Sequence, residues 1–173
     1  AIMGKNPVVA LYTFFVMPLT SVQGLSELLV KATPLVLIAI GLAMGFRANV
    51  WNIGAEGQLT LGAICGGGVA IYFYDSSSIF LLPGMIITGV LGGMAWAAIP
   101  AWLRTHFNAN EILTSLMLTY VAVLLLSFLV LGPWRDPGGY NFPETRLFSD
   151  AGTMPNLLFG TRLHLGAIFA LLA

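Results

Sequence analysis

The sequence is poor in charge, cysteine and histidine. Only 8% of its 173 residues are charged, whereas a soluble domain carries about 25%. Its net charge is zero and it has no basic patch with interleaved aromatics, so we expect no nucleic acid partner. A single cysteine, Cys65, excludes an internal disulfide, and neither His106 nor His164 has a Cys or carboxylate nearby at metal-ligand spacing. We therefore expect no metal and no cofactor in this chain.

The sequence also lacks the common signatures of catalysis. It has no phosphate-binding glycine loop, because the run at residues 66–68 is not followed by Lys and Ser or Thr. It has no nucleophile elbow and no paired catalytic carboxylates. These absences argue against an enzyme.

Apolar residues make up 58% of the chain and predict its fold class. So much apolar surface with so little charge indicates an integral membrane protein, and a crossing helix needs about 20 apolar residues. We expect an all-α, polytopic membrane helix bundle with a broken or re-entrant segment. A short apolar stretch at 6–20, bounded by prolines, is expected to form an interfacial or re-entrant helix. The predicted spans are 28–46, 59–74, 79–103 and 112–131, with another starting near 165.

The ends and loops suggest one part of a larger protein. The chain starts without Met and stops inside the apolar run 165–173, which is too short to cross a bilayer. We expect a single partial membrane domain from a longer polytopic protein. Arg104 and His106 mark a short loop that the positive-inside rule assigns to the cytoplasm. The long connection 132–164 then lies outside.

Three pairs of glycines are spaced four residues apart within the apolar segments. Each pair puts two small residues on one helix face, which lets a neighbouring backbone approach closely. Two interpretations stay open: packing within the bundle, or a hinge or solute-lining surface. The pairs are Gly41 and Gly45, Gly62 and Gly66, and Gly89 and Gly93.

The stretch 46–63, "FRANVWNIGAEGQLTLGA", gathers polar residues inside this apolar chain. Charges at bilayer depth mark functional sites, and irregular backbone there is tolerated only where protein buries it or it lines a wet cavity. One interpretation is a broken helix that lines a path for a polar, uncharged solute; the other is a wet cytoplasmic loop. Glu56 faces the solute, pairs with Arg47 or braces the bend. The candidate pathway residues are Arg47, Asn49, Trp51, Asn52, Gly54, Glu56, Gly57 and Gln58.

A second polar group, in "FNANEILTSLMLTY" at 107–120, stands where the span 112–131 begins. Asparagine is a good N-cap and an acid in the first turn complements the helix dipole, which favours a capping role. Residues at helical spacing here also fit a polar stripe that faces a pathway: Glu111, Thr114, Ser115, Leu118 and Thr119. The candidates here are Asn110, Glu111 and Thr114.

Several short sequence blocks, taken in order, resemble those of a known family. The stretch 46–63 is preceded by "ATPLVLIAIGLAMG" and followed by "NEILTSLMLTY", "GPWRDP" and "GTRLHLG". In these blocks the chain resembles the permease subunits of bacterial ABC importers for nucleosides and simple sugars, in the branched-chain amino acid and ribose permease superfamily. It departs from the pattern at Asn49, where glycine is usual, and this leaves the turn there in question.

The resemblance implies a function. It implies a permease subunit without catalytic activity, multi-pass in the bacterial inner membrane and surrounded by lipid, that forms the pathway with a second permease subunit in a homo- or heterodimer. Cytoplasmic ATP-binding subunits would hydrolyse ATP, and an extracytoplasmic solute-binding protein would deliver a nucleoside or simple sugar. The loop 132–164, with its "DPGG" turn, would be a docking surface of defined shape for that protein. The main ATPase-docking segment would belong to a C-terminal half outside this chain.

Two alternatives remain at this level. An ion-coupled secondary transporter would need a membrane-embedded acid, and Glu56 and Glu111 are the candidates. A non-transport membrane scaffold would not need a polar, glycine-broken segment. If the segment 47–58 lines a pathway, Glu56→Ala is expected to impair uptake while the complex still assembles.

Overall fold

The computed structural model describes residues 6–140 and 142–173, and its elements there are all helices. The predicted all-α bundle is confirmed. Two isolated bridges, Arg135 to Thr145 and Asn156 to His164, tie loops together without forming a strand. The elements in chain order are α1 (Pro7–Leu11), a π-helical turn (Tyr12–Val16), α2 (Met17–Thr20), α3 (Val22–Arg47), α4 (Ala55–Tyr72), α5 (Leu81–Phe107), α6 (Glu111–Leu131), a 3-10 turn (Asp150–Gly152) and α7 (Gly166–Leu172).

Three of these helices, α3, α5 and α6, are long and apolar enough to cross a membrane. In the apolar stretch of each, at most 17% of the residues are buried inside the protein. Side chains such as Leu124 and Phe128 on α6 are therefore exposed, and lipid rather than water suits such a surface. The helices α3 and α4 begin at Val22 and Ala55, earlier than the predicted spans at 28 and 59.

The chain divides into two compact units, 1–41 with 154–173 and 42–153. The first unit contains the short apolar helices between Pro7 and Thr20 and most of α3. In it, Arg162 donates from Nε and Nη2 to the two carboxylate oxygens of Glu27, at 2.9 and 2.6 Å. These bonds to a carboxylate raise the pKa of the Arg162 guanidinium above its ordinary value, so the pair stays charged on the arginine side at every physiological pH.

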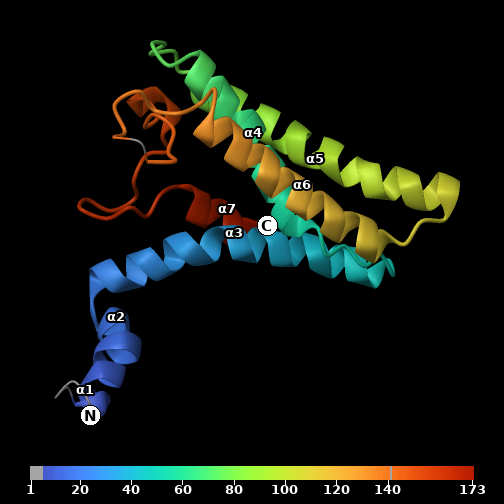
Figure 1. Ribbon diagram of the computed structural model, residues 1–173. Coiled ribbons are helices and arrows are strands. Elements are labelled where there is room, and N and C mark those ends of the chain that lie inside the picture. The colour runs from blue at the N-terminus through green and yellow to red at the C-terminus, as the bar shows by residue number, and fades with distance from the viewer. Residues whose placement is uncertain (1–5, 141) are drawn as a thin grey trace. The chain divides into compact units, whose positions relative to one another are not determined.

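The second unit is built on α4, which packs against both α5 and α6 (Figure 1). Its buried centre is Leu61, Ile64 and Ala122, with Trp96 and Trp134 among the partly buried side chains around it. In Figure 1 the turn between α5 and α6 lies at one end of these helices, and the turn between α4 and α5 lies at the other. At about 1.5 Å per residue, the 18 residues of α4 span about 27 Å. A crossing by α4 stays a prediction, since it is less apolar than the other three.

Two of the glycine pairs pack α4 against α5. A Cβ on Gly66 would lie 2.8 Å from the Met85 carbonyl oxygen, and one on Gly62 would lie 3.0 Å from that of Gly89. On the other side, a Cβ on Gly93 would lie 3.2 Å from the Gln58 carbonyl oxygen. Backbone approaches backbone here without room for a side chain, so the packing interpretation is confirmed for these two pairs.

The connection after α6 folds onto the end of the α4–α5 hairpin. The Trp134 ring lies against Gly68, where a Cβ would meet it at 3.2 Å, and the Phe148 ring lies against Gly67 at 3.4 Å. The Arg146 guanidinium stands 5.6 Å from the centre of the Tyr74 ring, within cation–π range. The predicted turn in "DPGG" is present, because Gly138 N–H donates to the Asp136 carboxylate at 3.0 Å. These contacts fix the described residues around Trp134, Asp136 and Phe148 against the hairpin or in the turn.

This anchoring makes a prediction about the loop. Trp134→Ala removes a ring that packs against Gly68 and the core of this unit, so we expect local opening to become easier and protease cleavage between residues 135 and 150 to speed up several-fold. The measurement is limited proteolysis of the full-length protein in detergent. Tyr140→Ala is the control, because that side chain is 94% exposed. Equal cleavage of both variants would contradict the anchoring role of Trp134.

Candidate functional site

The segment between α3 and α4 is not helical. The last turn of α3 closes as Asn49 N–H donates to the Phe46 carbonyl at 3.0 Å and Val50 N–H to the Gly45 carbonyl at 2.9 Å. Asn49 has φ 57°, in the left-handed region that glycine adopts most easily and asparagine next. The turn in question at this position is therefore formed, with asparagine in the left-handed conformation. The predicted break in the helix is present at residues 48–54.

After this turn, residues 50–54 run alongside the first turns of α6. Trp51 N–H donates to Glu111 Oε1 at 2.8 Å, and Ile53 N–H donates to Ser115 Oγ at 3.3 Å. Gly54 N–H is satisfied by the Asn52 side-chain oxygen at 2.8 Å. Backbone N–H groups outside regular structure need hydrogen-bond partners, and here side chains supply three of them.

Glycine lets the segment and α4 come this close to α6. A Cβ on Gly54 would lie 2.8 Å from the Ser115 carbonyl oxygen, and a Cβ on Gly57 would lie 2.8 Å from the Thr119 Cα. Both glycines are buried, as are Ser115 and Thr119. Gly54 and Gly57 thus act through close packing, which brings the start of α4 against α6.

The turn between α5 and α6 brings two opposite charges together. Asn108 ends α5 in the left-handed conformation, with φ 51°, and the Asn110 side chain caps α6 by accepting from Ile112 and Leu113 N–H at 3.0 and 3.3 Å. Arg104 near the end of α5 then pairs through Nη1 with Glu111 Oε2. The Glu111 carboxylate is 15% exposed and the Arg104 side chain 41%, so the pair is shielded on the side of the acid.

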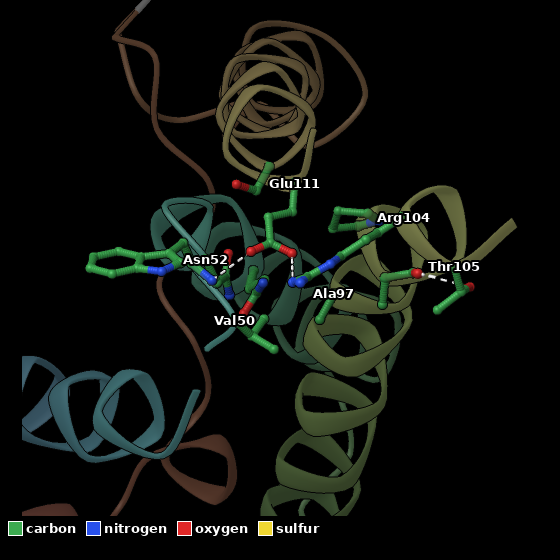
Figure 2. A pocket seen from close by; sticks show the side chains of 11 residues that line it. Val50, Asn52, Ala97, Arg104, Thr105 and Glu111 are labelled. Atoms are coloured by element: carbon green, nitrogen blue, oxygen red, sulfur yellow. Dashed lines mark hydrogen bonds and ion pairs between the residues drawn. The ribbon is translucent and has the colours of Figure 1, made fainter. Parts of the chain in front are cut away.

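A pocket of about 440 Å³ opens beside this ion pair. Figure 2 shows Glu111 between Arg104 on one side and the segment of Val50 and Asn52 on the other. The pocket combines an apolar wall with a few polar groups, as small-molecule sites do. Its lining residues are Val50, Trp51, Asn52, Gln58, Ala97, Pro100, Ala101, Arg104, Thr105, Glu111 and Ser115.

Four of the residues predicted from the sequence line this pocket: Trp51, Asn52, Gln58 and Glu111. Trp51 is 51% exposed, and its ring centre lies 5.1 Å from that of Phe46. Two of the four, Asn52 and Gln58, carry side-chain amides. Their role in a solute pathway stays a prediction.

The other predicted residues lie elsewhere. Asn110 is the N-cap of α6, which confirms the capping interpretation, and the Thr114 hydroxyl donates to the Asn110 carbonyl one turn back at 3.0 Å. Arg47, Asn49 and Glu56 are exposed and do not line the pocket. The pairing of Arg47 with Glu56 is wrong for the described residues, where the ion pairs are Arg104 with Glu111 and Arg162 with Glu27. Because α4 starts at Ala55, Glu56 sits in its first turn, where an acid complements the helix dipole.

Three polar residues that line the pocket, Arg104, Thr105 and Ser115, are not among the site residues predicted from the sequence. The sequence marks Arg104 only for the orientation of the loop, and it places Ser115 in the polar stripe that is the alternative pathway-facing interpretation. One signal was available: Arg104 and Glu111 carry opposite charges on either side of a short turn between two helices. The described residues hold no group of three or more His, Cys, Asp or Glu side chains that would bind a metal.

Comparison with known proteins identifies the family of this chain. Residues 24–173 match the family described as branched-chain amino acid transport system, permease component, and the chain belongs to this family. It is therefore a multi-pass membrane protein of the permease class.

Several curated proteins are similar over most of this chain. The glucose ABC transporter permease protein of Haloferax volcanii is 47% identical over 88% of this chain and 40% of its own length. The guanosine ABC transporter permease protein of Bacillus subtilis is 32% identical over 85% and 42%, and the nucleoside ABC transporter permease protein of Lactococcus lactis is 27% identical over 98% and 49%. The chain spans less than half the length of these relatives. No solved structure matches it.

Proposed function

We propose that the whole protein is the permease subunit of an ATP-driven importer, and that it forms part of the translocation pathway for a nucleoside or a simple sugar. The observation that carries this proposal is the pocket between the broken segment, α5 and α6, in a chain of the permease family. The named solutes of the relatives are glucose, guanosine and nucleosides, all polar and uncharged. A pocket with two side-chain amides and an aromatic ring suits such solutes.

The proposal includes the partners that an importer needs. ATP hydrolysis is left to separate cytoplasmic ATP-binding subunits, so this subunit has no catalytic activity. A second permease subunit completes the pathway, and an extracytoplasmic solute-binding protein docks on the ordered loop after α6. In this orientation the α5–α6 turn, with Arg104 and His106, faces the cytoplasm, as the positive-inside rule favours. The protein resides in the cell membrane, which in a Gram-negative bacterium is the inner membrane.

An ion-coupled transporter is less well supported by the geometry. Such a mechanism uses a membrane-embedded acid that gains and loses an ion. Glu56 is exposed at the start of α4, and Glu111 already has one oxygen on Arg104 and the other on the Trp51 amide. A non-transport scaffold would give no reason for the pocket.

The test is uptake of radiolabelled nucleosides and glucose by the full-length complex in membrane vesicles. Two samples are compared, one with active ATPase subunits and one in which the ATPase subunits bind ATP without hydrolysing it. We expect uptake to need hydrolysis and to fall to background in the inactive sample. Uptake that continues without hydrolysis and collapses with the ion gradient would favour the ion-coupled alternative.

A further inference from the structure

The segment 50–54 is held by side chains of α6 rather than by its own backbone. Both carboxylate oxygens of Glu111 are occupied, Oε1 by Trp51 N–H and Oε2 by Arg104. The Ser115 hydroxyl is occupied too: it accepts from Ile53 N–H and donates to the Ile112 carbonyl at 3.2 Å. We propose that Glu111 and Ser115 are positioning residues, which hold this segment so that Trp51 and Asn52 face the pocket. The inference rests on the proposed function, because it assigns roles within the same site.

The spacing of the two acceptors matches the spacing of the two donors. Along a helix, residues four apart are separated by about 6 Å, since each residue rises about 1.5 Å. Along extended backbone, residues two apart are separated by about 6.7 Å and point their N–H groups to the same side. Glu111 and Ser115 are four apart on α6, and Trp51 and Ile53 are two apart in the segment. The first two turns of α6 therefore act as a template for the two N–H groups of the segment.

Asn52 lies between the two residues whose N–H groups are bonded to α6. With the N–H groups of Trp51 and Ile53 directed at α6, Asn52 between them lines the pocket and also closes the turn into α4 through Gly54. Without the Glu111 and Ser115 acceptors, the two N–H groups would lose their partners and the segment would no longer be held in one position along α6. The position of Asn52 then depends on two hydrogen bonds that hold the residues on either side of it to α6.

Arg104 links this template to α5. Its guanidinium fixes the second oxygen of Glu111, and the two residues flank the α5–α6 turn. A carboxylate is a stronger hydrogen-bond acceptor than a neutral group, which favours its bond to Trp51 N–H. Arg104 thus acts on the segment only through Glu111, whereas Glu111 acts on it directly.

A charge exchange separates the two roles of Glu111. The double variant Arg104→Glu with Glu111→Arg restores opposite charges across the turn, but arginine has no acceptor for Trp51 N–H. Glu111→Gln keeps an acceptor oxygen and loses the charge. We expect ATP-driven uptake, per assembled full-length complex, to be highest in the wild type, lower in Glu111→Gln and lowest in the exchanged pair. Wild-type uptake by the exchanged pair would overturn the proposal, because Glu111 would then serve only the ion pair.

A second measurement is independent of transport. In a full-length protein with Cys65→Ser and every cysteine outside these 173 residues replaced, Asn52→Cys reports the exposure of position 52 to a membrane-impermeant thiol reagent. Adding Ser115→Ala is expected to raise the labelling rate roughly five- to tenfold, since the loss of one hydrogen bond shifts a local opening equilibrium by about that factor. Ser127→Ala is the matched control, because that exposed hydroxyl on the same helix donates only to the Val123 carbonyl at 2.9 Å.

The outcomes separate this inference from the proposed function. Equal labelling in the Ser115→Ala and Ser127→Ala backgrounds would overturn the positioning role, whatever the complex transports. Faster labelling in the Ser115→Ala background alone would support it even if uptake proved independent of ATP hydrolysis.

Discussion

Gly57→Leu is expected to abolish uptake and to lower the amount of assembled complex sharply. A Cβ at this position would lie 2.8 Å from the Thr119 Cα and 3.2 Å from its backbone nitrogen. Backbone atoms inside a helix cannot rotate away as a side chain can, so α4 must move off α6. Forcing extra carbons into a packed interface costs about 1–3 kcal/mol or more. The shift would also displace Gln58, the next residue, from the pocket wall.

The matched control is Gly84→Leu on α5. No other atom lies within 4 Å of a Cβ built at Gly84, so the added side chain meets open space or lipid. We expect this variant to assemble and transport close to the wild type. The measurements are the yield of assembled complex after gel filtration in detergent and uptake per assembled complex. Wild-type yield and uptake by Gly57→Leu would contradict the close packing of α4 and α6.

The helices were largely predictable from the sequence because each carries its own signal. Apolar runs of sufficient length predict α5 and α6 within a few residues, and the Asn110 cap predicts the start of α6 at Glu111. The start of α3 was harder, since Val22 to Glu27 contains polar residues that mask the helix. The start of α4 was missed by four residues, because the helix includes the polar Glu56 and Gln58 in its first turn.

The site was predictable only in part, because its contacts join distant parts of the chain. The sequence marks the polar segment and the polar start of α6 as two separate groups. It does not reveal that Trp51 bonds to Glu111, since 60 residues separate them and no local spacing links them. The expected partner of the segment was therefore the nearest opposite charge, Glu56 for Arg47. In the structure the ion pair near the segment is Arg104 with Glu111, because the α5–α6 turn brings these two residues together.

Because Arg104 pairs with Glu111, we expect Glu111 rather than Glu56 to be the acid on which uptake depends most. A comparison of the variants Glu111→Ala and Glu56→Ala tests this expectation. Both variants remove one carboxylate from a first helical turn. Losing Glu111 removes the acceptor of Trp51 N–H and the partner of Arg104, and a hydrogen bond to a charged group is worth about 1.5–3 kcal/mol. Because Arg104 is 41% exposed, water offsets much of the loss on its side. We expect uptake per assembled complex to fall roughly ten- to a hundredfold.

Losing Glu56 removes an exposed acid whose main effect is on the dipole of α4, worth about 0.3–1 kcal/mol. We expect uptake by Glu56→Ala to fall at most about fivefold, in line with that energy. The comparison is made in the same vesicles, with uptake normalised to assembled complex. If Glu56→Ala lowered uptake as much as Glu111→Ala did, Glu56 would lie on the solute path, as the polar stretch 46–63 suggests. The pocket beside Arg104 and Glu111 would then be a secondary feature of the permease. Removing Glu111, which lines the pocket, would lower uptake no more than removing Glu56, which lies outside it.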